Sequence, residues 1–194
     1  MTTALVSHSL MTDAGDSVRA LVRSAAGAPL DVRTPCEEWN LGRLVQHQLY
    51  YTPILAASGR RVETSVSGGE LDVSLDAWAD ELDSAIADLA AVWSTPEAWS
   101  GLTSMSGSDP MPAELIGGMV LGELVVHGWD LARAAGVEPE FSDEVLAGTM
   151  VAVTSMAELG RGMGIFGAEV VVDLDSPLLD RIVALTGRDP HWNK

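Results

Sequence analysis

The feature that most constrains this chain is a long apolar stretch, residues 111–136, with very few polar side chains. Its spacing predicts one helix, ended by Gly136 in the position of a glycine cap. A helix that is apolar nearly all round is normally buried, so an ionisable group on it needs a partner. Glu123 and His127 lie four residues apart, one helical turn apart on the same face, and could hold one metal ion together. The stretch therefore predicts a polar site inside the core.

The rest of the sequence predicts further helices joined by irregular segments. Apolar residues recur at helical spacing in five places, and the expected helices cover residues 8–26, 41–58, 74–94, 142–159 and 176–185. Asn40, Ser74 and Ser142 are the expected N-caps of three of these helices. Residues 59–73 and the glycine-rich run 160–167 are expected to be loops, 95–111 an irregular segment or short hairpin, and 170–172 an extended segment. The pattern indicates an all-α helical bundle forming a single domain over residues 1–194.

A third metal-ligand candidate lies on the expected helix 41–58. Metal sites in helical bundles are built from side chains that project inward from facing helices. His47 lies three residues after Leu44 and four before Tyr51, at the edge of the apolar face of its helix. From the residues alone, a buried ion pair or hydrogen-bonded histidines remain the alternative to a metal site, because Glu-x-x-x-His is a weak motif.

Charge and composition narrow the classes of partner. The chain has 11 Lys and Arg against 28 Asp and Glu, a formal net charge of −17. Phosphate backbones and anionic membranes would repel such a chain, so neither nucleic acid nor a membrane is an expected partner. The single cysteine, Cys36, excludes an internal disulfide and suits a reducing compartment. No secretory signal pattern is apparent at the N-terminus, and the expected location is the cytoplasm.

Four other side chains have expected roles in the site or in the core. Asp130 belongs to the same stripe as Glu123, seven residues on, and would either orient a ligand histidine or lie on the surface beside Arg133 and the loops. Cys36 is expected to be a small packed residue. Trp39 and Trp129 are expected to be core anchors.

Several motifs together resemble a known family. They are Thr34-Pro35-Cys36 followed by Trp39, then Leu44 and His47, then Glu123-Leu-Val-Val-His127-Gly-Trp-Asp-Leu-Ala-Arg133, and finally Gly187-Arg188-Asp189-Pro190. Over essentially its whole length the chain resembles the DinB-like four-helix bundles of the mycothiol-dependent maleylpyruvate isomerase N-terminal-domain family. The resemblance implies metal ligands at His47, Glu123 and His127. Zinc is the lead metal, and the same ligands also suit iron(II) or nickel.

The resemblance also implies a function. The leading expectation is a thiol-dependent S-transferase or isomerase that uses mycothiol, with a small-molecule thiol and an electrophilic substrate as partners. Arg161, in the glycine-rich run, is the expected residue for the polar groups of the thiol. Family members with the full isomerase reaction carry a C-terminal domain that supplies an essential arginine, and a chain ending at Lys194 is expected to lack it.

Two other functions stay open at this point. One is a non-catalytic metal-binding or regulatory protein, and the other is a metal-dependent hydrolase, for which the sequence identifies no general base. A homodimer is kept as an open expectation for the assembly.

Overall fold

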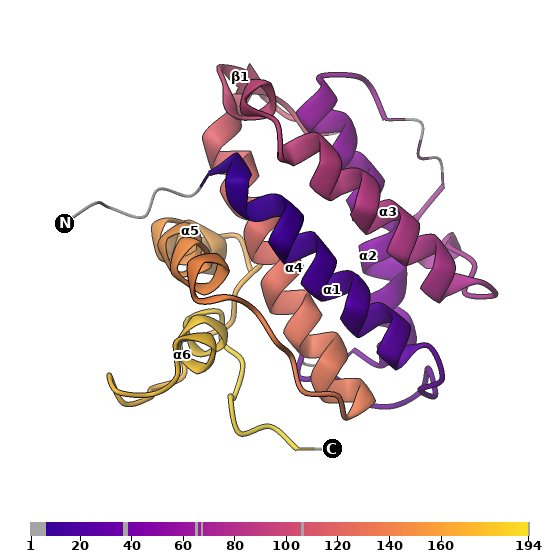
Figure 1. Ribbon diagram of the computed structural model, residues 1–194, viewed down its shortest axis with the longest axis vertical. Coiled ribbons are helices and arrows are strands. Elements are labelled where there is room, and N and C mark those ends of the chain that lie inside the picture. Colours follow the sequence, from indigo (N-terminus) through magenta and orange to yellow (C-terminus); the bar gives the residue numbers. More distant parts are fainter. Residues whose placement is uncertain (1–6, 37–38, 65, 67, 106, 194) are drawn as a thin grey trace.

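A computed structural model describes residues 7–36, 39–64, 66, 68–105 and 107–193 (Figure 1). Its helices are α1 (Met11–Ala25), α2 (Leu41–Arg60), α3 (Trp78–Trp93), α4 (Ala113–Ala135), α5 (Asp143–Gly162) and α6 (Leu178–Leu185). The first four form a bundle in which α1 and α2 each pack against both α3 and α4. On the other side of α4 lies α5, and α6 packs on α5. In Figure 1 these last two helices are seen nearly end-on, so they cross the direction of the bundle.

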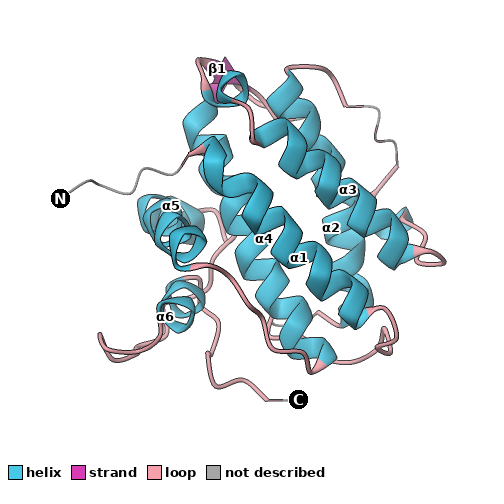
Figure 2. Ribbon diagram, in the orientation of Figure 1, coloured by secondary structure: helices cyan, strands magenta, loops and turns pink. Residues whose placement is uncertain are grey.

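Strand structure is minimal in the described part of the chain (Figure 2). β1 (Leu102–Thr103) pairs antiparallel with β2 (Met111–Pro112), with Leu102 opposite Pro112 and Thr103 opposite Met111. Three short 3-10 helices complete the elements: η1 (His8–Leu10), η2 (Glu70–Asp72) and η3 (Pro96–Trp99). The predicted all-α class is confirmed, and segment 95–111 forms the short hairpin that was one of its two expected states.

The predicted central helix forms α4 and lies in the core. Ile116, Leu121 and Leu131 on it are completely buried. Gly136 ends the helix with φ of 74°, the left-handed conformation that favours glycine, so the predicted cap is confirmed. By length and composition α4 could cross a membrane, but 83% of its most apolar window is buried inside the protein. It therefore has the environment of a core helix.

Side-chain caps mark two of the predicted helix starts. The Asn40 side chain accepts a hydrogen bond from the Arg43 amide at 2.9 Å, and Ser142 does the same for Val145 at 3.3 Å. The prediction that Ser74 caps the third helix is wrong, because α3 begins only at Trp78. Ser74 instead accepts from the Asp76 amide at 3.3 Å, a local turn that precedes the helix.

The predicted loop 160–167 begins three residues too early. Helix α5 continues through Gly162, and the chain leaves it around Gly164, which has φ of 73°. Gly160 is needed for packing, because a Cβ there would lie 2.8 Å from the Phe166 ring. The glycine in the helix permits a close contact with the chain that folds back over it. Residues 170–172 pair in no strand, although the Val170 amide donates to the Ala184 carbonyl at 3.0 Å.

One connection matters for the site. Helices α2 and α3 run in the same direction in Figure 1, so the chain between them, of which the structure describes residues 61–64, 66 and 68–77, returns along the bundle. Within this connection η2 packs against α2. The connection therefore places Glu70 beside the first part of α2, where His47 lies.

Candidate metal centre

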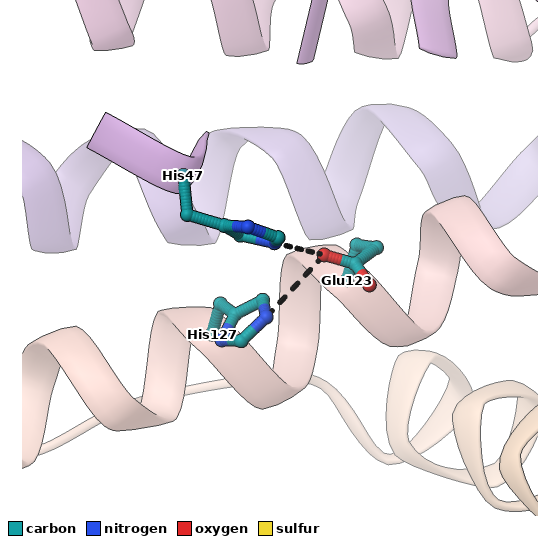
Figure 3. Close-up of side chains that lie close together, drawn as sticks. All are labelled: His47, Glu123 and His127. Carbon is teal, nitrogen blue, oxygen red and sulfur yellow. Dashed lines mark ion pairs between the residues drawn. The ribbon is translucent and has the colours of Figure 1, made fainter. Parts of the chain in front are cut away.

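Three predicted ligand residues converge between α2 and α4. His47 projects from α2, and Glu123 and His127 project from α4 toward the same point (Figure 3). One ligand atom from each residue lies within 4.8 Å of the others, the arrangement of a group that could hold a metal ion. Glu123 Oε2 is 3.6 Å from His47 Nε2 and 3.4 Å from His127 Nε2.

These separations fit an ion better than direct bonding. Donor atoms bound tetrahedrally to one zinc at 2.0–2.2 Å lie about 3.3–3.6 Å from each other. Good N–H···O hydrogen bonds are shorter, about 2.7–3.2 Å. The two separations from Glu123 fall in or near the range for a shared ion, and all three donor atoms lie within 4.8 Å of one another, so two imidazoles and one carboxylate could share an ion and leave other coordination positions open. The residues present therefore fit a divalent ion of the zinc, nickel or iron(II) type.

His47 is oriented by a carboxylate on the α2–α3 connection. Its Nδ1 lies 2.8 Å from Glu70 Oε1, which also accepts from Arg43 at 2.7 Å. An ionised carboxylate can only accept, so the His47 proton lies on Nδ1 and Nε2 presents its lone pair to the metal position. Arg43 also lies over the Trp39 ring, with its guanidinium carbon 4.9 Å from the ring centroid.

His127 is oriented in the same way by a second carboxylate. Its Nδ1 lies 2.9 Å from Asp130 Oδ2, and Asp130 is completely buried. Arg188, from the chain that follows α6, donates to Asp130 at 2.9 Å through Nη2 and at 3.2 Å through Nε. Of the two roles considered for Asp130, the structure shows the orienting one. Its cation is Arg188 and not Arg133.

The electrostatics of the cluster favour charged carboxylates. Burial raises the pKa of Asp130, but the charges of Arg188 and His127 outweigh burial and the net pKa is lowered. Burial likewise opposes ionisation of Glu123, yet His127, His47 and Arg188 hold its pKa below the usual range. Burial lowers the pKa of His47, but the nearby Glu123 and Glu70 carboxylates raise it overall. Glu123 and His47 therefore stabilise each other's charged forms. A divalent ion bound between them would take the place of the proton on His47.

A cavity of about 510 Å³ opens beside the three ligands. Its described lining includes Trp39, whose ring centroid is 4.9 Å from that of His47, and Tyr51, at 4.7 Å from His47. Trp39 is half-buried: it packs against the hydrophobic core, as expected, and also lines the cavity. Trp129 is 2% exposed, which confirms the expectation that it is a core anchor. Cys36 also lines the cavity, which the sequence did not predict.

Arg161, the residue expected to bind the thiol, lies elsewhere. Its guanidinium donates to the Leu185 carbonyl at 3.2 Å and it is not among the described residues that line the cavity. The arginine that does line the cavity is Arg188. A role of Arg161 in thiol binding stays a prediction.

Sequence reasoning missed Glu70 altogether and named Arg161, not Arg188, as the arginine of the site. Glu70 lies 23 positions from His47 on an irregular segment, and Arg188 lies 58 positions from Asp130. No helical periodicity links such pairs. A motif signal existed only for Arg188, in Gly187-Arg188-Asp189-Pro190.

Comparisons with known proteins agree with this architecture. An uncharacterized protein of Mycobacterium tuberculosis, found in strains CDC 1551 and H37Rv, is 25% identical over 180 residues, covering 90% of this chain and 93% of its own length. The crystal structure of the mycothiol-dependent maleylpyruvate isomerase superposes with a TM-score of 0.56 at 17% identity, over 84% of this chain and 75% of that one, and so shows the same fold. The model of the mycothiol maleylpyruvate isomerase N-terminal domain matches residues 11–132. The chain therefore belongs to the mycothiol maleylpyruvate isomerase N-terminal domain family.

Proposed function

We propose that this protein is a metal-dependent thiol S-transferase, with mycothiol as the thiol and zinc as the metal. The observation that carries the proposal is the convergence of His47, Glu123 and His127 at the wall of a cavity large enough for a small ligand. A site that only stabilised the fold would close all coordination positions with protein groups, whereas three protein ligands leave room for a reactant.

The chain's own residues fix the geometry of the reaction. Glu70 and Asp130 hold the two imidazoles with Nε2 toward the metal position, and Glu123 supplies the one anionic ligand. A divalent ion held there would supply Lewis acidity, lowering the pKa of a thiol and providing a thiolate at neutral pH. The Trp39 and Tyr51 rings lie next to His47 and line that side of the cavity.

The proposed reaction joins the thiol to an electrophilic carbon. The thiol sulfur forms a bond to that carbon, the leaving group departs with the bonding electron pair, and the thiol proton passes to water. The family membership and the shared fold support mycothiol as the thiol. A cytoplasmic location, where low-molecular-weight thiols stay reduced, belongs to the same proposal.

The test is conjugation of mycothiol to monochlorobimane, followed by fluorescence, with zinc-loaded protein. We expect a rate above the uncatalysed reaction, abolished by chelation and by His47→Ala. The matched control is His191→Ala, which removes an exposed histidine near the C-terminal end of the chain and should leave the rate unchanged. Circular dichroism checks that both variants are folded.

A negative result would be specific. If no low-molecular-weight thiol gives a metal-dependent rate above background, and calorimetry detects no thiol binding, the transferase proposal fails. Metal binding by the same protein would then favour a non-catalytic role for the bundle.

A further inference from the structure

The cavity beside the metal position also indicates the kind of electrophile that would fit. We infer that the site takes an uncharged, apolar electrophile, such as a benzylic or other alkyl halide, and discriminates against carboxylates. This inference rests on the proposed S-transferase function for the reaction. Its claim about which ligands the cavity accepts can be measured separately.

Part of the cavity wall is apolar. Met119 and Val126 of α4, Val153 and Met156 of α5, and Ile165 and Phe166 of the following loop form it. Burying apolar ligand surface against such a wall is favourable in proportion to the area removed from water. Backbone polar groups on this side are largely used within α4 and α5.

Glycines on α4 widen this part of the cavity. Gly118 and Gly122 line it, and a Cβ at Gly122 would meet only Val153, at an ordinary contact distance of 3.7 Å. Close helix packing therefore does not require glycine at position 122. The missing side chain instead leaves space on the cavity side of the helix, close to Glu123.

Among the described lining residues, Arg188 is the one arginine or lysine, and its donors are already engaged. Its Nε and Nη2 donate to Asp130, its Nη1 lies 3.3 Å from Thr186 Oγ1, and the side chain is 8% exposed. Arg43 is likewise held by Glu70.

Two carboxylates line the same space, those of Glu70 and Glu123. A divalent ion at the metal position would be the one cation open to a substrate carboxylate, and in the proposed reaction the thiol would occupy it. Elsewhere in the cavity a substrate carboxylate would lie near these anions and find no unengaged arginine or lysine among the described lining residues. Burying it without a partner is costly. The formal net charge of −17 adds a long-range field that repels anions.

The test compares two electrophiles of the same shape and reactive group. Methyl 4-(chloromethyl)benzoate is neutral, and 4-(chloromethyl)benzoate carries one carboxylate. With either substrate, the thiol sulfur bonds to the benzylic carbon as the C–Cl bond breaks, chloride leaves with the bonding pair, and the thiol proton passes to water. We expect the rate enhancement over the uncatalysed reaction to be at least about tenfold larger for the ester than for the acid.

A binding measurement on the metal-free protein separates the cavity from the chemistry. Saturation-transfer NMR with the unreactive pair methyl 4-methylbenzoate and 4-methylbenzoate should show binding of the ester in preference to the acid. Ile165→Lys adds a cation at the 48% exposed rim of the cavity and should raise binding of the acid several-fold. Val171→Lys adds the same charge at a 94% exposed position outside the described lining and should leave the preference unchanged.

Each outcome decides one of the two claims. If wild type conjugates the acid as well as the ester, or the acid binds as well as the ester, the inference is overturned while the S-transferase proposal stands. If neither ligand binds, the inference also fails. If the ester binds preferentially and Ile165→Lys raises binding of the acid several-fold, but no thiol is conjugated, the cavity inference stands and the proposed function fails.

Discussion

At the scale of single residues, the site depends on both nitrogens of each histidine. His47 and His127 both direct Nε2 toward Glu123, and both place Nδ1 against another carboxylate, that of Glu70 for His47 and that of Asp130 for His127. A carboxylate in that position fixes the tautomer and the ring orientation and makes the imidazole a stronger ligand. Removing such a partner leaves all three metal ligands in place, so its contribution can be measured separately from theirs.

The first prediction concerns Glu70. We expect Glu70→Ala to weaken zinc affinity about 10–100-fold, because His47 loses the acceptor at its Nδ1. The measurement is competition for zinc with a chromophoric chelator. Glu81→Ala, which removes an exposed carboxylate of α3, controls for the change in net charge. Equal affinities for the two variants would show that Glu70 does not orient the ligand.

At the scale of elements, the site combines the family domain with the segment that follows it. The family match covers residues 11–132 and includes all three ligand residues and Asp130. Arg188, which neutralises Asp130, comes from the chain after α6. The chain beyond residue 132 therefore completes the site twice, by supplying this arginine and by contributing Val153, Met156, Ile165 and Phe166 to the apolar wall of the cavity.

This division also explains what could be predicted from the sequence. The Glu123 and His127 pair follows from helical spacing, and His47 from its place at the edge of an apolar face, because both depend on local periodicity. Glu70 and Arg188 depend on how the α2–α3 connection and the chain after α6 return to the bundle. Those paths are set by packing between distant segments. For the same reason, Gly160 looked like a loop residue until its contact with Phe166 was known.

A second prediction tests the ion pair between these elements. Arg188→Met should lower the free energy of unfolding by about 3–5 kcal/mol, because it leaves the completely buried Asp130 carboxylate without its cation. Asp130→Asn combined with Arg188→Met should recover much of that loss, since the neutral amide needs no cation. Denaturant unfolding of the three proteins measures both effects. A loss below about 1 kcal/mol for Arg188→Met would be typical of an exposed pair and would contradict the buried arrangement.

At the scale of the whole molecule, the metal position links α2 to α4 across the bundle. These helices carry His47 on one side and Glu123 with His127 on the other, and they also contact each other directly. An ion that needs ligands from both helices binds the folded chain and has no comparable site in the unfolded one. Its binding free energy should therefore appear as stability of the entire domain.

The last prediction follows from that linkage. At free zinc a hundredfold above the dissociation constant, the folded state should gain about 2.7 kcal/mol. For a chain of this size the gain corresponds to a rise of roughly 5–10 °C in melting temperature. Calorimetry with and without chelator should show this shift for wild type and for His191→Ala, whose histidine is exposed. His127→Ala removes one of the three donors and should respond little to chelator, whatever its own baseline stability. An equal response of His127→Ala and wild type would place the zinc somewhere other than between α2 and α4.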